Sequence, residues 1–418
     1  MPSRVRGRFS AMTRGKLFVL IITNFVDMVG LLMVLPLIPF YAMDMGGGGL
    51  IVAILVVSFT AAQLLSAPLW GRFSDRYGRR PALLVGLTAA AVAYIVFAFA
   101  TSIWLLLLSR IVQGAGGGTV GVIQAYVADA VEPENRAKAL GWLSAATNVG
   151  VAIGPALGSA ALVMGRPGPG LTAAGLCLLN IFFAWRFLRE SRDMTDVSDK
   201  KPGTSRAMIA RVISHAGEPA PKLIWIYAIA MGAFSGLMAI LALFLADRFG
   251  VNEDNIWIFF SYVGVISVVT RAGILGWAVD RYGEARLSRV GLILLAVGLA
   301  TIPFAVGYVT LALSVALIPL GTAFTFPCVT SMLSRVIPSR ERGMYMGVQQ
   351  TFGGLARVIV PLWAGFAYDH FGKTVPFFTS AALVGGTLLF GRGMDDGRAR
   401  ASTADQAAAK LDTEKIAG

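Results

Sequence analysis

Twelve apolar segments, each long enough to cross a membrane as a helix, dominate this chain. A spanning helix needs about 20 mostly apolar residues. Apolar residues make up 56% of the chain and charged residues 14%, whereas soluble proteins hold roughly 25% charged residues. Such a chain cannot cover its apolar surface in water, so lipid must be its solvent. The predicted spans are 17–43, 50–70, 81–100, 103–128, 137–162, 170–190, 222–247, 254–276, 286–306, 308–334, 343–368 and 373–392.

The predicted fold class is therefore an all-α polytopic membrane protein with two six-helix halves. A polar stretch of about 30 residues separates the sixth span from the seventh and predicts a linker. The basic N-terminus and the long first span favour an uncleaved helix over a signal peptide. The predicted division is a cytoplasmic N-terminus (1–16), an N-terminal half (17–190), a cytoplasmic linker (191–221), a C-terminal half (222–392) and a cytoplasmic tail (393–418).

The positions of the basic residues predict the orientation. Lys and Arg concentrate in cytoplasmic segments of membrane proteins. With the N-terminus placed in the cytoplasm, 30 of the 36 Lys and Arg fall on that side. The others lie on the opposite side (Arg166, Arg248, Lys373) or inside spans (Arg110, Arg271, Arg357). We therefore expect a multi-pass protein of the cell membrane (inner or plasma membrane) with both termini cytoplasmic. Its net charge of +13 then reflects topology and anionic lipid head groups, not nucleic acid.

The few cysteines and histidines argue against metal or redox chemistry. Cys177 and Cys328 both fall inside apolar runs, and His215 and His370 are the only histidines. No Cys/His metal spacing, phosphate loop or pairing of a nucleophile with a base is present in the sequence. We expect no cofactor, no bound metal and no enzyme activity.

An internal repeat relates the two halves. Residues 71–78 (GRFSDRYG) follow span 2, and residues 276–283 (GWAVDRYG) follow span 8 at an offset of 205 residues. Pro133, Arg136 and Gly141 have counterparts at an offset of 205 or 206 residues around the start of span 11. Parallel halves of this kind place the substrate path between them, and alternating access rocks one half against the other.

The segment Gly71-x-x-x-Asp75-Arg76-x-Gly78-Arg79-Arg80 resembles the signature loop of the major facilitator superfamily. The resemblance extends over residues 17 to 392 and is strongest to twelve-span drug:proton antiporters, including tetracycline efflux proteins. It is carried further by residues 27–41 (DMVGLLMVLPLIPFY), by residues 124–129 (QAYVAD) with Arg136, and by a glycine-proline motif in span 5. The resemblance implies that this last motif, Gly150, Gly154, Pro155 and Gly158, serves antiport. Independently, glycines at every fourth position predict a smooth strip for close helix packing.

The signature segment is predicted to act as a conformational latch. Asp75, at a cytoplasmic helix end, can accept hydrogen bonds from the N-terminus of a helix in the other half, span 11 being the expected partner. The flanking arginines suit lipid phosphates and nearby carboxylates such as Asp129. The alternative is a basic loop that only sets topology. The predicted latch residues are Gly71, Asp75, Arg76, Gly78, Arg79, Arg80, Asp129, Arg136, Asp280 and Arg281.

Asp27 is the one acidic residue well inside a span, and intramembrane carboxylates are functional by default. Burial disfavours a charged carboxylate, so Asp27 is the predicted proton carrier. Arg110 in span 4 is its predicted partner, either directly or through water and Gln113. The alternative is a purely structural pair of Asp27 and Arg110.

A largely apolar cavity with few polar groups is predicted to bind the substrate, because such cavities suit amphipathic compounds. Arg357 could bind an anionic group of the substrate or pair with Asp27. The predicted cavity residues are Asn24, Asp27, Gln113, Gln124, Phe234, Gln349, Gln350 and Arg357.

These features favour a monomeric, proton-coupled exporter of small amphipathic compounds or drugs. Tetracycline exporters carry an acid in span 9 and a histidine in span 8, and this chain has neither, so tetracycline is not the expected substrate. Two alternatives remain open. One is a uniporter or symporter for sugars or other metabolites in the same fold, and the other is a non-transporting membrane sensor or scaffold.

Overall fold

The computed structural model describes residues 3–131, 133–188, 190, 205–338 and 341–390. Within these ranges the chain is helical and contains no strand. Most of the predicted linker (191–204) and the whole predicted tail (393–418) lie outside the described residues. The remainder of the linker contains a short helix, α9 (Ser205–Ser214), which the sequence does not predict.

Each predicted span corresponds to helix. Eight spans each contain one long helix. They are α3 (Gly49–Tyr77), α4 (Arg79–Ala98), α7 (Pro133–Ala161), α8 (Gly168–Phe187), α10 (Pro219–Phe249), α14 (Tyr308–Val336), α15 (Arg342–His370) and α16 (Val375–Phe390). Short 3-10 turns interrupt or end others. Span 1 comprises α1 (Ser3–Val34), a turn with Pro36, and α2 (Ile38–Asp44), while span 9 is α13 (Glu284–Thr301) followed by a turn with Pro303.

Spans 4 and 8 are interrupted within the membrane. Span 4 consists of α5 (Ile103–Gly116) and α6 (Thr119–Ala130), separated at Gly117 and Gly118. Span 8 consists of α11 (Ile256–Val269), a π-helical turn over Thr270–Ile274, and α12 (Leu275–Tyr282). Irregular backbone inside a membrane is tolerated only where neighbouring protein or a cavity satisfies it. These two interruptions therefore mark places of functional interest.

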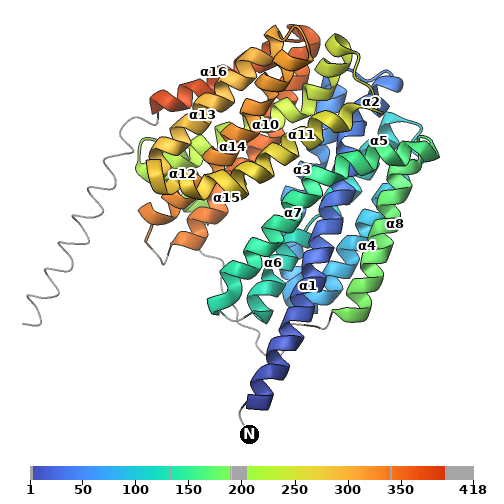
Figure 1. The fold of residues 1–418 in the computed structure, drawn as a ribbon, viewed down its shortest axis with the longest axis vertical. Helices are drawn as coiled ribbons and strands as arrows, with labels where there is room; N and C mark the ends of the chain where they lie inside the picture. Colours follow the sequence, from blue (N-terminus) through green and yellow to red (C-terminus); the bar gives the residue numbers. More distant parts are fainter. Residues whose placement is uncertain (1–2, 132, 189, 191–204, 339–340, 391–418) are drawn as a thin grey trace, which may run out of the picture. The chain divides into compact units, whose positions relative to one another are not determined.

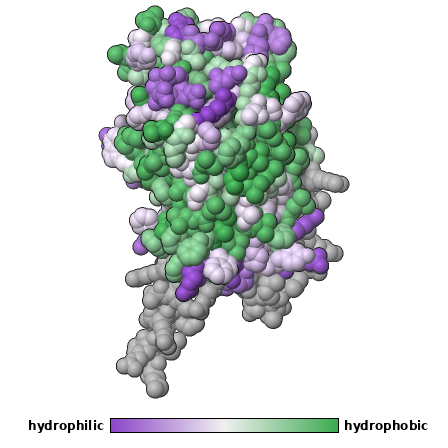
Figure 2. All heavy atoms as spheres, turned by 90° about the vertical axis from the view of Figure 1, so that its right-hand side faces the viewer, coloured by the Kyte–Doolittle hydropathy of each residue, from purple (hydrophilic) through white to green (hydrophobic). Residues whose placement is uncertain are grey.

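Ten helices within the described residues are long and apolar enough to cross a membrane. The two remaining predicted spans are α16, whose described part is shorter, and α15, which carries Gln349, Gln350, Arg357 and Asp369 along its length. Large apolar side chains such as Leu65, Trp104 and Val163 are more than 75% exposed. Hydrophobic residues cover much of the middle of the face in Figure 2, with hydrophilic residues gathered toward its ends. This is the surface expected of a protein solvated by lipid.

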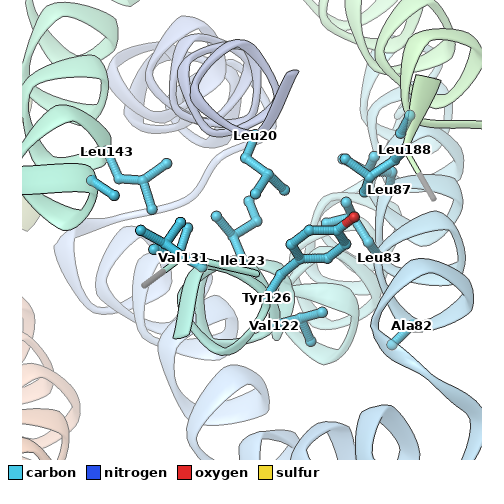
Figure 3. Close-up of a cluster of buried hydrophobic side chains, with 13 residues drawn as sticks. Leu20, Ala82, Leu83, Leu87, Val122, Ile123, Tyr126, Val131, Leu143 and Leu188 are labelled. Atoms are coloured by element: carbon cyan, nitrogen blue, oxygen red, sulfur yellow. The ribbon is translucent and has the colours of Figure 1, made fainter. Parts of the chain in front are cut away.

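The described helices form two compact units. The first contains the N-terminal half together with residues 235–268 and 357–376, and the second contains the described residues among 205–234, 269–356 and 377–390. Within the first unit, α1 packs against α7 and α8 (Figure 1). A core cluster fills this unit, with Leu20 of α1, Leu83 of α4, Ile123 and Tyr126 of α6 and Leu143 of α7 pointing toward one another (Figure 3). This core fixes the positions of α1 and α6, which carry Asp27 and Thr119 of the candidate site.

Candidate functional site

The signature segment, Gly71 to Arg80, is helical except at Gly78. Helix α3 continues through Tyr77, and only Gly78 leaves the helical conformation, with φ of +102°. Its counterpart in the second half behaves alike, since α12 runs to Tyr282 and Gly283 has φ of +77°. L-residues rarely adopt such φ values. A Cβ at Gly71 would meet no atom within 4 Å, so no steric contact in the structure requires glycine at this predicted latch position.

Glu190 holds the turn at Gly78 in place. Its two carboxylate oxygens accept hydrogen bonds from the backbone N–H groups of Arg79 (2.9 Å) and Arg80 (3.0 Å), the first two residues of α4. A Cβ at Gly78 would lie 2.4 Å from Glu190 Oε2. The residue must therefore be glycine both for its backbone conformation and to admit Glu190, a contact that the sequence reading missed.

Arg79 is the centre of the ion-pair network in the signature segment. Its guanidinium contacts Asp75 (Nη1–Oδ1, 2.9 Å) and Asp129 (Nε–Oδ2, 2.8 Å), and donates to Ser74. The predicted contact of these arginines with Asp129 is thus present. Arg80 donates to the carbonyl of Trp185, and Arg136 donates to the carbonyl of Val131 (3.0 Å). Arg76, Asp280 and Arg281 are exposed on their helices.

The second half repeats this ion pair with the charges exchanged. Glu284 stands where the offset of 205 residues places the counterpart of Arg79. Its Oε1 accepts hydrogen bonds from Arg335 Nη2 (2.7 Å) and Ser331 Oγ (2.8 Å). Each half therefore ties the start of its third span to the end of its fourth. The repeat offset, applied to Arg79, would have found Glu284.

The glycine strip of α7 lies against α1. A Cβ at Gly150 would approach Met28 Cβ to 2.9 Å, one at Gly154 would approach Leu32 Cβ to 2.7 Å, and one at Gly158 would approach the carbonyl oxygen of Met33 to 2.3 Å. The predicted close packing is confirmed, and its partner is the helix that carries Asp27. Pro155 lies within α7.

Asp27 lies on α1 beside the interruption of span 4. Its Oδ2 accepts a hydrogen bond from Thr119 Oγ1 (3.1 Å), and Thr119 is the first residue of α6. The positive end of a helix dipole at such a half-helix favours a nearby anion. Thr119 was not among the predicted site residues. The glycine run 116–118 that precedes it was the signal that could have identified this position.

Arg110 is 1% exposed, yet in the described part of the chain it forms no ion pair with Asp27. The predicted direct pairing is therefore not what the structure shows. The guanidinium instead donates to Gln113 Oε1 and lies over the ring of Phe59, 4.7 Å from its centroid. Gln113 in turn donates to Tyr94 Oη (2.8 Å). The Nε of Arg110 has no hydrogen-bond partner among the described residues.

Tyr94, another residue that the sequence reading missed, brings this chain of contacts to α1. A Cβ at Gly30, one turn beyond Asp27, would lie 3.0 Å from Tyr94 Oη. The absence of a side chain at Gly30 thus admits the tyrosine hydroxyl. Asp27 and Arg110 belong to one polar region of the first unit, formed by α1, α4, α5 and α6, but are held by different partners.

The predicted cavity residues fall into two groups. Asn24 is 3% exposed and donates to the carbonyl of Leu143 (3.0 Å) and to Thr147 Oγ1 (2.7 Å), so it ties α1 to α7. Gln349 is fully buried and donates to Thr330 Oγ1 (3.3 Å). Both side chains serve helix packing, which corrects the prediction that they face a cavity. Of the remaining ones, Gln124 and Gln350 are exposed, and Phe234 and Arg357 are half-buried.

The described residues contain no group of three or more His, Cys, Asp and Glu side chains that could hold a metal ion. Cys177 and Cys328 are both free and buried.

A family model described as the Major Facilitator Superfamily matches residues 20–274 and 272–411. The chain belongs to the Major Facilitator Superfamily. This membership and the many apolar helices make it a multi-pass membrane protein of a transporter family, in agreement with the resemblance found in the signature segment.

Curated relatives and solved structures of this superfamily match nearly the whole chain. Multidrug resistance protein 2 of Bacillus subtilis (strain 168) is 24% identical over 389 residues, which covers 92% of this chain and 97% of that protein. Tetracycline resistance protein, class C, of Escherichia coli is 28% identical over 389 residues, covering 90% and 94%. The crystal structure of the human organic anion transporter MFSD10 (TETRAN) shares the fold, with a TM-score of 0.64 and 23% identity over 91% of this chain and 99% of that one.

Proposed function

We propose that this protein is a proton-coupled exporter that moves small amphipathic compounds or drugs out of the cell by alternating access. The observation that carries the proposal is the placement of Asp27. This carboxylate lies inside the first span, bonded to Thr119 at the interruption of span 4. A carboxylate in that setting can take up a proton and release it, which a purely structural role does not require.

The second component is Arg110, a buried cation that pairs with Gln113 and Phe59 instead of a carboxylate. The network of Gln113 and Tyr94 fixes its guanidinium while leaving Nε without a partner in the described structure. We propose that Arg110 senses the charge of Asp27 through this polar region. Protonation of Asp27 then changes the electrostatic environment of Arg110.

The third component is the glycine strip at Gly150, Gly154 and Gly158, which brings α7 into close contact with the α1 segment around Asp27. Closely packed interiors have low compressibility and transmit strain. A change around Asp27 is thereby passed to span 5. Relatives named for multidrug and tetracycline resistance support drug export as the direction of transport.

In the same scheme, the signature segment is the cytoplasmic latch. The bonds of Arg79 and Glu190 make the end of α3 and the start of α4 one rigid corner. Asp75 is carried at this corner, and we propose that it bonds to the N-terminus of span 11 when the cytoplasmic side closes. The proposal places the protein in the cell membrane as a monomer, with both termini in the cytoplasm and anionic lipid head groups around its basic segments.

A drug-susceptibility panel in a host that lacks its own efflux pumps tests the export function. The wild-type protein is expected to raise tolerance to one or more amphipathic compounds, and Asp27→Asn is expected to abolish that gain at equal expression. Asp254→Asn, which removes an exposed carboxylate from the segment between α10 and α11, is the matched control and is expected to keep the gain in tolerance.

Unchanged tolerance to every compound with the wild-type protein would contradict export and favour the non-transporting sensor or scaffold. Increased sensitivity to a compound would indicate uptake, as expected of a symporter or uniporter. Retained tolerance with Asp27→Asn would show that export does not need this carboxylate.

A further inference from the structure

A single carboxylate joins the last turn of span 11 to the first turn of span 2. Asp369, one residue before the end of α15, accepts hydrogen bonds from the backbone N–H groups of Gly49 (Oδ1, 2.7 Å) and Leu50 (Oδ2, 2.8 Å). Gly49 is the first residue of α3 and lies 320 positions away in the sequence. The first N–H groups of a helix have no partner within the helix, so Asp369 supplies an N-terminal cap from a distant part of the chain.

Glycines make this contact possible. A Cβ at Gly365 would lie 2.4 Å from the carbonyl oxygen of Gly49, and a Cβ at Gly49 would lie 2.9 Å from Asp369 Oδ1. Ala53, on the next turn of α3, is completely buried, and its Cβ would be 2.6 Å from a Cβ at Gly365. The backbones of α3 and α15 therefore approach as closely as they can, and any larger side chain would push Asp369 away from its two donors.

A second carboxylate strengthens the same end of the first unit. Asp247, in the last turn of α10, accepts a hydrogen bond from Tyr368 Oη and pairs with Lys373 Nζ (2.8 Å). Tyr368 is the neighbour of Asp369 on α15. The ends of spans 7 and 11 are thus tied to each other at the point where span 11 is tied to span 2.

From these contacts we propose that Asp369 and the N-terminus of α3 form the outer latch of the protein, the counterpart of the predicted cytoplasmic latch at Asp75. Asp75 lies at the inner end of span 2 and is expected to cap span 11. Asp369 lies at the outer end of span 11 and caps span 2. The same two spans therefore offer each other a carboxylate cap at opposite membrane surfaces.

This inference rests on the proposed alternating access, because a latch has a function only if its side opens. Capping at Asp369 requires that the outer ends of α3 and α15 meet, so it can exist only while the outer side is closed. Loss of a contact made in one conformation shifts the population toward the other. The state with the outer side closed is thus favoured by Asp369, and the opposite state by Asp75.

Distance measurements on the full chain in lipid nanodiscs, without substrate, test the outer latch. Spin labels are placed through Val163→Cys, in the turn that follows α7 of span 5, and Thr374→Cys, in the loop between α15 and α16. The background variant carries Cys177→Ala and Cys328→Ala in place of the two buried cysteines. Asp369→Asn is expected to raise the ratio of long to short label distances about five- to thirty-fold, as the loss of one or two hydrogen bonds would. Asp254→Asn, the matched control, is expected to leave the distances unchanged.

Gly365→Ala supplies an independent variant, because it keeps every charge and separates α15 from α3 by steric contact alone. It is expected to shift the distances in the same direction as Asp369→Asn. Unchanged distances in both variants would overturn the outer latch. Since the measurement involves no transport, a shift in these distances together with a failure of the wild-type protein to export any compound would leave the latch standing and remove the proposed function.

Discussion

Gly158→Ala is predicted to destabilise the packing of α7 on α1, and the structure gives the size of the effect. The added Cβ would lie 2.3 Å from the carbonyl oxygen of Met33, about 1.1 Å short of the 3.4 Å at which ordinary van der Waals contact begins. The obstacle is backbone, so a side-chain rotation cannot relieve it. Inserting a methyl group into a packed interior of this kind costs about 1–3 kcal/mol.

Gly141→Ala is the matched control for this substitution. Both glycines lie on α7, but Gly141 is exposed and a Cβ there would meet no atom within 4 Å. Replacement of glycine by alanine in a helix is itself favourable by about 1 kcal/mol, and this gain is common to both variants. The difference between the two free energies of unfolding therefore isolates the steric term of about 1–3 kcal/mol.

Unfolding of the purified protein in mixed micelles, followed by circular dichroism as denaturing detergent is increased, measures this difference. Gly158→Ala is expected to unfold at a lower detergent fraction than the wild-type protein, and Gly141→Ala at an equal or higher one. Equal stability of the two variants would refute the inference that the glycine strip exists for close contact with α1.

Three further predictions concern other parts of the protein. Arg110→Lys is expected to reduce efflux about ten-fold at equal expression, because an ammonium cannot stack on Phe59 and bond Gln113 as the guanidinium does. Efflux at the wild-type rate by this variant would show that only the positive charge at position 110 matters. Glu190→Ala is expected to lower the free energy of unfolding by about 1–2 kcal/mol through loss of the cap on Arg79 and Arg80, whereas Glu218→Ala, which breaks an exposed pair with Arg211, is expected to cost at most about 1 kcal/mol. Burial, and to a lesser extent Asp44, raises the pKa of Glu253, with Arg166 opposing. A carboxyl with a raised pKa holds its proton longer in the folded state, so the wild-type protein is expected to lose stability as the pH rises above 4.5, and Glu253→Gln is expected to flatten that part of the curve in detergent unfolding.

The fold could be predicted from the sequence because the length and apolar composition of a segment identify a membrane helix. Each of the twelve predicted spans contains helix. The glycine strip was equally predictable, since its spacing of four residues belongs to one helix face, and the structure adds only that its partner is α1. The contact of Arg79 with Asp129 could also be predicted, because the two residues carry opposite charges and lie at neighbouring helix ends.

The site was harder to predict because its contacts cross between helices that are distant in the sequence. Asn24 and Gln349 are polar residues on helix faces, and the sequence could not show that those faces point at α7 and α14. Thr119 and Tyr94 carry no charge and look like ordinary members of apolar spans, so their bonds to Asp27 and Gln113 went unpredicted. Asp369 was overlooked for a related reason, since its partners are backbone N–H groups, which every sequence has.

Proton coupling through Asp27 is tested most directly by proton movement in vesicles that contain the purified protein. The vesicles enclose a pH-sensitive dye and an acidic interior, and a compound to which the protein confers tolerance is added outside. We expect the compound to enter while the interior becomes alkaline with the wild-type protein and with Asp254→Asn. With Asp27→Asn, the compound should cause no change in internal pH, although the variant is inserted to the same level. Proton movement at the wild-type rate with Asp27→Asn would contradict the assignment of this carboxylate as the proton carrier.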